Sequence, residues 1–373
     1  MVASRGADIV THHKKTYLTS DGKLALAKAA TVAAGIIGVT AFLVAPRRRD
    51  WRTTAQWKQI EKHRYAHRGL FEEPPSAQAY PKGTAGDPWK NDTDLLTMPD
   101  KVVQFADKIK KRSDAPVATP LWAEDVKHAT RPIVPENSLP AFRAAAEAGY
   151  GVELDVRLTK DNVLVVVHDS DLERLCGRAG FVEQLTHEEL CEYHLLGTDE
   201  RIPTLEQVLS LFETAPKTGA RRPPLIIEIK STMSNYVDLT RMTMLALDHA
   251  DVSYCIESFD PRVLSWLRHN RPDVFRGQLS EDYLADRGTE KYGVPMRWIL
   301  SSLFANVLGR PDFVAYKYSD RHNLFVWLCR RVLRGHLITW TVRSDNDLAE
   351  SEREGAPAIF EYIRPDTRSR LSK

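Results

Sequence analysis

Five side chains of this sequence could together act on a phosphorus centre. They are two histidines and three carboxylates, each at or near the end of a strand-like run: His67, Glu153, Asp155, His168 and Glu228. Cleavage of a phosphodiester needs proton transfer at two oxygens, which two imidazoles can carry out. It also needs charge to be neutralised at phosphorus, which a hard cation held by carboxylates can do. The set therefore indicates metal-assisted phosphodiester chemistry.

Each of these residues alone has an ordinary structural explanation. A carboxylate at a strand end often only reaches solvent or a salt bridge, and a single histidine is commonly part of a core. Their shared position argues for a site, because the runs at Val163–Val167 and Leu225–Ile227 both place a polar residue, His168 or Glu228, at the carboxyl end. Parallel α/β folds gather their functional residues at that end of their strands.

The residue types suggest how the five would divide the chemistry. Glu153 and Asp155 are two apart and point to one side of a strand, and Glu228 on a neighbouring strand completes a set of oxygen ligands. Such a set suits Mg²⁺ or Ca²⁺. His67 and His168 would be the general acid and base, because imidazole changes protonation near neutral pH. Which histidine has which role stays open, and salt-bridged carboxylates and core histidines remain the structural alternatives.

Nine strand-like runs alternate with helical segments along the chain. They lie at residues 63–69, 151–157, 163–167, 225–230, 253–258, 275–279, 313–318, 337–342 and 358–361. Only about five residues separate the second run from the third, whereas a parallel crossover needs about a dozen. The third run is therefore predicted to be an antiparallel hairpin strand that carries His168 back toward Glu153 and Asp155. Eight strands then remain for an α/β fold of the (β/α)8 barrel type.

Length and composition agree with one large domain and additional segments. The chain has 373 residues, of which 43% are hydrophobic, and such a barrel usually needs about 250 residues. The net charge of +2, from 52 basic and 50 acidic residues, argues against a dedicated nucleic-acid-binding protein. The spacing of the cysteines argues against structural zinc. They are Cys176, Cys191, Cys255 and Cys329.

The segment Leu24–Ala45 is apolar and contains a single charged residue, Lys28. As a helix it would extend about 33 Å, enough for a bilayer core. We expect a retained, single-pass transmembrane helix; a cleaved signal peptide and an Ala/Gly-rich helix lying on the protein are the alternatives. Basic residues flank both sides, and the cluster Arg47–Arg49 gives a slight preference for a cytoplasmic catalytic domain.

From Tyr65 to Asp366 the chain resembles the glycerophosphodiester phosphodiesterase (GDPD) family, in motifs, order and rough spacing. The matching stretches are HRG at 67–69, PENSLPAF at 135–142, ELDVRLTKD at 153–161, VVVHD at 165–169, IPTLEQVL at 202–209, EIK at 228–230, SFDP at 258–261 and WTV at 340–342. The resemblance implies a TIM barrel of the phospholipase-C-like phosphodiesterase type. It also implies metal-dependent hydrolysis of glycerophosphodiesters to sn-glycerol 3-phosphate and an alcohol.

The resemblance further assigns residues that bind the substrate and its phosphate. They are Arg68, Lys230, Glu136, Asn137 and Trp340. Arg68 and Lys230 would reach the phosphate, for which a planar donor fork and a compact charge are both suitable. Asn137 would help to organise the site, although it or Ser138 could simply cap the following helix. Trp340 would form an apolar wall for the glycerol or the leaving alcohol, or else belong to the core.

The chain departs from the family pattern in three places. About 65 residues, Leu70–Val134, separate HRG from PEN, and Pro99–Arg112 within them reads as a basic amphipathic helix. This insertion could be a lid, a lipid-surface contact, a partner site, or a solvated helix packed on the barrel. Arg343 follows WTV where the family commonly has Asn, and AIFEY at Ala358–Tyr362 replaces a GIITD-like strand. These two differences bear on substrate preference.

The predicted organisation divides the chain into five parts. They are a leader at 1–23, the transmembrane helix at 24–45, a basic linker at 46–62, the catalytic barrel at 63–366 with its insertion at 70–134, and a tail at 367–373. We expect an enzyme that hydrolyses phosphoric diesters, with a small glycerophosphodiester as substrate. One alternative is a lipid phosphodiesterase, either a lysophospholipase D or a sphingomyelinase-D-like enzyme. The other is a non-catalytic membrane protein that binds lipid headgroups.

Overall fold

The computed structural model describes residues 20–48, 50–78, 120, 122–215, 222–232, 234–285, 293–367 and 371. The chain forms two compact units, Met1–Phe42 and Leu43–Lys373. Within the described ranges, no helix is both long enough and apolar enough to cross a membrane. The transmembrane helix predicted for Leu24–Ala45 is therefore not supported, although this segment forms most of helix α1 (Ser20–Val44).

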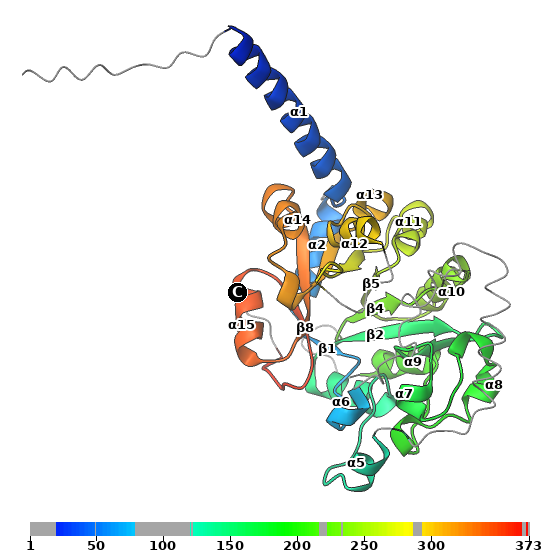
Figure 1. Ribbon diagram of the computed structural model, residues 1–373. Helices are drawn as coiled ribbons and strands as arrows, with labels where there is room; N and C mark the ends of the chain where they lie inside the picture. The colour runs from blue at the N-terminus through cyan, green and yellow to red at the C-terminus, as the bar shows by residue number, and fades with distance from the viewer. Residues whose placement is uncertain are drawn as a thin grey trace, which may run out of the picture. The chain divides into compact units, whose positions relative to one another are not determined.

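The second unit is built around a closed barrel of parallel strands (Figure 1). The strands are β1 (Tyr65–His67), β2 (Gly151–Leu158), β3 (Leu164–Val166), β4 (Leu225–Ile229), β5 (Tyr254–Ser258), β6 (Arg276–Ser280), β7 (Phe313–Lys317), β8 (His336–Val342) and β9 (Ala358–Phe360). Their order is β1-β9-β8-β7-β6-β5-β4-β2, and pairing of β1 with β2 closes the ring. The predicted (β/α)8 barrel is confirmed.

Strand β3 lies outside this ring and pairs with β2 in the antiparallel sense, with Val156 opposite Val166. The turn between them is closed by Thr159, whose hydroxyl accepts a hydrogen bond from the backbone N–H of Val163 at 2.8 Å. Asn162 in the same turn has a φ of 64°, a conformation that asparagine tolerates better than most residues. The predicted hairpin is therefore confirmed, and it carries His168 back over the carboxyl end of β2.

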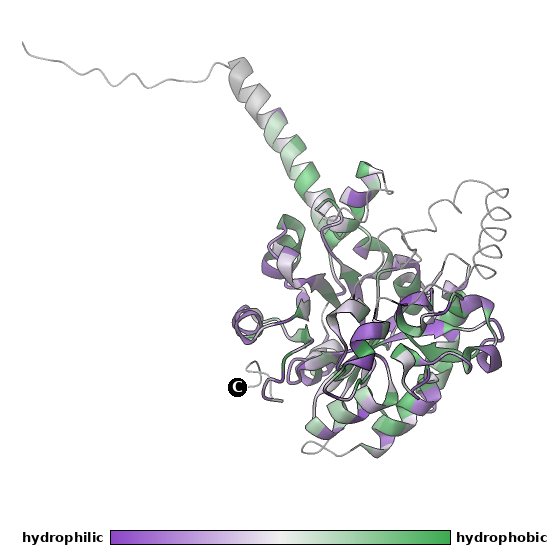
Figure 2. Ribbon diagram, turned by 60° about the horizontal axis from the view of Figure 1, so that its bottom comes forward, coloured by the Kyte–Doolittle hydropathy of each residue, from purple (hydrophilic) through white to green (hydrophobic). Residues whose placement is uncertain are grey.

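Helices connect the strands and cover the outside of the barrel. They are α2 (Trp51–Ile60), α5 (Ala123–Lys127), α6 (Leu139–Ala148), α7 (Glu173–Cys176), α8 (His187–Leu190), α9 (Leu205–Thr214), α10 (Tyr236–Asp248), α11 (Pro261–Asn270), α12 (Val294–Ser301), α13 (Asn306–Gly309), α14 (Leu324–Trp327), which continues as the π-helix η7 (Leu328–Val332), and α15 (Asp345–Arg353). Figure 2 shows hydrophobic and hydrophilic residues on opposite sides of several of these helices. The apolar sides pack on the strands: Phe142 of α6 and Phe212 of α9 are fully buried in one cluster with Leu154 of β2.

Residues 46–62, predicted to be a basic linker, contain helix α2. Asp50 caps it, because its side chain accepts a hydrogen bond from the backbone N–H of Thr53 at 2.8 Å. Trp57 is buried with Phe275 and Phe313, which lie at the amino-terminal ends of β6 and β7. Helix α2 therefore covers the amino-terminal end of the barrel, opposite the carboxyl ends of the strands.

The two ends of the insertion at 70–134 are held together by backbone pairing. Glu72 and Val134 exchange two hydrogen bonds, of 2.8 and 2.9 Å. The flanking motifs also touch, because the N–H of Asn137 donates to the carbonyl of Arg68 at 2.9 Å. The HRG and PEN motifs therefore meet despite the residues between them. The helix predicted for Pro99–Arg112 lies outside the described residues.

Candidate active site

Three carboxylates meet on neighbouring strands β2 and β4. Asp155 and Glu228 are register partners, and Glu153 precedes Asp155 by two residues on β2. Each offers an oxygen within 4.8 Å of the others, and all three side chains are buried. The structure therefore brings together the three metal ligands predicted from the sequence.

The cluster has the electrostatic properties of a cation site. Burial, together with the charges of Asp155 and Glu228, raises the pKa of Glu153 well above its usual value, and burial raises the pKa of Glu228 to about 7. The Oδ1 atom of Asp155 is buried and accepts no hydrogen bond from any described residue. Three carboxylates so close together repel one another unless protons or a cation intervene. Their oxygen donors suit Mg²⁺ or Ca²⁺.

Two cationic side chains lie beside the carboxylates. The Nζ atom of Lys230 is 3.0 Å from Oε1 of Glu228 and 3.4 Å from Oδ1 of Asp155. The Nε atom of Arg68 is 3.4 Å from Oδ2 of Asp155. Burial acts to raise the pKa of Asp155, but Lys230, His168 and Arg68 hold it well below its usual value. A negative Asp155 is therefore stabilised before any ligand enters.

The PEN motif contributes through side chains that face the same cluster. Asn137 donates a hydrogen bond from Nδ2 to Oδ2 of Asp155 at 2.8 Å. The cap of α6 is Ser138, whose hydroxyl accepts from the backbone N–H of Ala141. Asn137 thus orients a carboxylate of the site, and the capping role belongs to its neighbour. Glu136 accepts a hydrogen bond from Nη1 of Arg68 at 2.8 Å and so positions that guanidinium.

His67 ends β1 and is held between two acidic residues. Its Nδ1 atom lies 2.7 Å from Oε2 of Glu361, and its Nε2 atom lies 3.8 Å from Oε2 of Glu153. Burial acts to raise the pKa of Glu361, but the hydrogen bond to His67 and the charge of Arg343 lower it to about 2. An ionised carboxylate only accepts hydrogen bonds, so Nδ1 is the donor and Nε2 faces the carboxylate cluster.

His168 also has a carboxylate at its Nδ1 atom. Its Nδ1 atom lies 2.5 Å from Oδ1 of Asp169, and Oδ2 of Asp169 pairs with Nε of Arg174 at 2.5 Å. Arg157 donates two hydrogen bonds to the carbonyl of His168, at 2.9 and 2.7 Å. Burial and the charges of Arg68 and nearby Lys230 lower the pKa of His168 to about 4. The ring is therefore neutral at neutral pH.

Both histidines and the three carboxylates form one electrostatic unit, because His168 and His67 each lower the pKa of Asp155. Trp340 on β8 is linked to Lys230 of the site through the ring of Phe259. Its half-buried indole stands edge to face with Phe259 at 5.5 Å, and Lys230 lies 5.9 Å from the Phe259 ring. Trp340 also packs partly against the core residues of the barrel interior, so the structure leaves both predicted roles, substrate wall and core residue, in place.

Several residues of the site were not predicted. Glu361 and Glu257 both follow apolar strand residues, so the signal that identified Glu228 was also present for them. Glu257 is the register partner of Glu228, is buried, and has an Oε2 atom that accepts no hydrogen bond from the described residues. Arg174 and Glu73 both contact Glu136, and no periodic pattern marks either.

Comparisons with known proteins agree with this geometry. Residues 128–359 match the model of the Glycerophosphoryl diester phosphodiesterase family. A glycerophosphodiester phosphodiesterase of Caldanaerobacter subterraneus subsp. tengcongensis is 38% identical over 210 residues, covering 53% of this chain and 82% of that protein. A second one, from Bacillus altitudinis, is 31% identical over 160 residues, 40% of this chain and 63% of that protein, so the chain spans less than two thirds of it.

A solved structure is also similar. It is that of an Oleispira antarctica phosphodiesterase in complex with the product sn-glycerol-3-phosphate, 18% identical, covering 61% of this chain and 87% of that one, with a TM-score of 0.49. The family model matches more than half of this chain, and the Caldanaerobacter protein is matched over most of its length. The chain therefore belongs to the Glycerophosphoryl diester phosphodiesterase family, whose members are phosphodiesterases that hydrolyse glycerophosphodiesters.

Proposed function

We propose that this chain hydrolyses glycerophosphodiesters to sn-glycerol 3-phosphate and an alcohol, using a divalent cation and two histidines. The observation that carries the proposal is the convergence of His67 and His168 on the buried carboxylate cluster. Nε2 of His67 lies 3.8 Å from Oε2 of Glu153, and the N–H of Val167, next to His168, donates to the carbonyl of Asp155 at 2.9 Å. Two acid–base groups next to a cation site, with cationic side chains beside it, meet the requirements of diester cleavage.

Glu153, Asp155 and Glu228 would hold the cation, Mg²⁺ or Ca²⁺. When bound, it would neutralise charge on the phosphate and make an oxygen nucleophile more acidic. Arg68 and Lys230 lie next to the same carboxylates and would contact the phosphate oxygens. Such positively charged donors stabilise the charge that develops on the phosphate during cleavage.

His168 is assigned as the general base. Its pKa of about 4 leaves the ring neutral at neutral pH. Asp169 lies at its Nδ1 atom, so Nε2 is free to accept a proton from the attacking oxygen. His67 is assigned as the general acid, because Nδ1 donates to the Glu361 carboxylate and Nε2 faces the carboxylate cluster. It would donate the Nε2 proton to the leaving alkoxide.

The test is turnover by the purified full chain with Ca²⁺, Mg²⁺ or chelator. Substrates are glycerophosphocholine, glycerophosphoethanolamine, glycerophosphoglycerol and lysophosphatidylcholine. Cation-dependent release of glycerol 3-phosphate, lost in His67→Ala and kept in the matched variant His269→Ala on α11, supports the proposal. Cleavage of lysophosphatidylcholine alone assigns a lipid substrate instead, and no turnover of any diester despite tight cation binding rejects catalysis.

A further inference from the structure

The helices beside strands β7 and β8 expose large apolar side chains. On α14, Leu324 and Trp327 are 67% and 53% exposed, and on α12, Val294 and Trp298 are 65% and 44% exposed. Side chains of this size are seldom exposed in groups unless the surface contacts another molecule or a membrane. We call this surface the apolar–basic face. Its apolar members are Val294, Met296, Trp298, Ile299, Leu324, Trp327 and Val332.

The two helices form one continuous surface, because three aromatic rings join them. Trp298 of α12 stands edge to face with Phe304 at 4.9 Å and with Phe325 of α14 at 5.9 Å. Phe304 and Phe325 are themselves 5.4 Å apart. The exposed parts of α12 and α14 are thus held side by side by a packed cluster.

The two segments that contain α12 and α14 have basic residues and no acidic ones. Residues 293–311 and 321–344 contain arginines and no aspartate or glutamate. Arg331 and Lys58 are exposed, and neither has an ion-pair partner within the described ranges. Arg330 pairs with Glu354, at 3.5 Å, and is thereby fixed next to Arg331. Arg331 on this face and Lys58 on neighbouring α2 therefore carry positive charge outside any ion pair of the described residues.

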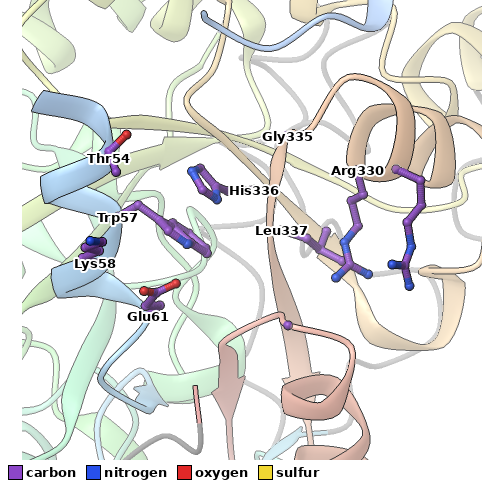
Figure 3. Close-up of a pocket in the computed structure, with 10 residues that line it drawn as sticks. Thr54, Trp57, Lys58, Glu61, Arg330, Gly335, His336 and Leu337 are labelled. Carbon is purple, nitrogen blue, oxygen red and sulfur yellow. The ribbon is translucent and has the colours of Figure 1, made fainter. Parts of the chain in front are cut away.

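A pocket of about 410 Å³ lies where the face meets α2, at the amino-terminal end of β8. In Figure 3, Lys58 and Thr54 project from α2 on one side of it and Arg330 lies on the other. Its floor is the Trp57 ring, stacked on His336 at 4.0 Å. Trp51, one turn before Thr54 on α2, is 76% exposed. The lining thus holds three cations, Lys58, Arg330 and Arg331, against one carboxylate, Glu61, and carries an excess of positive charge.

Exposed tryptophans interleaved with cations fit the surface of a bilayer. Indole rings favour the boundary between headgroups and acyl chains, and arginine and lysine reach the phosphates above it. Anionic lipids attract such clusters further. The first residues of the Leu43–Lys373 unit pack beneath the same helices. Val44 is buried with Leu303 and Cys329, and its carbonyl accepts a hydrogen bond from Asn306.

We propose that the apolar–basic face docks the barrel on bilayers that contain anionic phospholipids. Leu324, Trp327 and Trp298 enter the headgroup region, and the pocket beside Lys58 and Arg331 receives lipid phosphate. Docking does not require catalysis, so the vesicle experiment tests it independently of the proposed function.

The test measures binding of the purified full chain to vesicles of phosphatidylcholine, alone or with about a third phosphatidylglycerol. The double variant Leu324→Glu, Trp327→Glu should lower the partition coefficient at least about tenfold, because it places charge in the apolar boundary. Its matched control is Val237→Glu, Leu245→Glu on α10, where the side chains are 37% and 52% exposed. The control should bind like the wild type.

A second pair tests the charges. Lys58→Glu, Arg331→Glu should remove the preference for anionic vesicles, whereas Arg143→Glu, Lys160→Glu, exposed residues away from the face, should keep it. All four substituted positions are exposed, so circular dichroism should show unchanged folding. Wild-type binding by both test variants would place membrane binding elsewhere in the chain and overturn the proposal. A changed oligomeric state without a change in vesicle binding would instead identify a second copy as the occupant.

Discussion

The Nδ1 atom of His67 and the Oε2 atom of Glu361 lie 2.7 Å apart, although 294 positions separate them in the chain. They meet because β1, the first strand, pairs with β9, the last. A carboxylate at Nδ1 fixes the tautomer of the ring and leaves Nε2 for chemistry. Glu361 is therefore a positioning residue for the proposed general acid.

Replacement of Glu361 by Gln should lower kcat about 10- to 100-fold, within the range that general acid catalysis contributes. The amide keeps the size of the side chain but is a weaker, uncharged acceptor for the Nδ1 hydrogen bond that orients His67. Because Glu361 does not contact the carboxylate cluster, KM should change little. Steady-state kinetics on glycerophosphocholine measure this split. Glu350→Gln, on the surface helix α15, is the matched control, and an equal loss in both variants would contradict the prediction.

Glu228→Gln should stabilise the protein in the absence of a cation and should reduce the stabilisation that a cation provides. In chelator the variant should have a higher Tm than the wild type, because one of three repelling carboxylates is gone. With saturating Ca²⁺ or Mg²⁺ the wild type should gain stability, about 2.7 kcal/mol at one hundred times Kd, and the variant should gain much less. Differential scanning calorimetry measures both. Equal cation-induced shifts in the two proteins would argue against Glu228 as a ligand.

Glu73 should make stability fall with rising pH. Burial and the charge of Glu136 raise the pKa of Glu73 to about 8, from 4.5. Between these two values the native protein holds a proton that the unfolded chain has released. The free energy of unfolding therefore falls as pH rises through this window, by up to about 1.4 kcal/mol per unit. Below it, the protonated form contributes its full stability.

Glu73→Gln should remove this contribution to the pH dependence. Urea unfolding at pH 5 and pH 8 provides the measurement. The free energy of unfolding of the variant, relative to that of the wild type, should be higher at pH 8 than at pH 5. If the difference in unfolding free energy between the two proteins is the same at both pH values, Glu73 ionises normally in the native state.

Gly69→Ala should impair both folding and activity. Gly69 has a φ of 85°, and a Cβ there would lie 2.8 Å from the backbone carbon of Ala141. The substitution should cost about 1–3 kcal/mol of stability from backbone strain alone, and should push the HRG motif away from helix α6. Thermal unfolding and kcat/KM are the measurements. Gly355→Ala, with a φ of 82° and open space around it, is the control that separates strain from the clash.

Much of the barrel could be predicted from local patterns. All nine strand-like runs correspond to strands, and the hairpin of β2 and β3 followed from a connection too short for a crossover. Such features depend on neighbouring residues and on alternation along one segment, which a single chain displays. The runs that became β2 and β4 likewise revealed Glu153, Asp155 and Glu228, because alternation puts Glu153 and Asp155 on one side of a strand and Glu228 follows an apolar run.

Other features depend on contacts between distant segments. Residues 46–62 showed basic charge, but Trp57 finds its apolar partners only after the barrel closes and exposes its amino-terminal end. The 70–134 insertion seemed to separate HRG from PEN, and the pairing of Glu72 with Val134 rejoins them. Glu361 reaches His67 because ring closure sets β9 beside β1. Residue type and order were enough to indicate the chemistry, whereas these contacts were decided by the tertiary structure, because local patterns do not specify contacts between segments far apart in the chain.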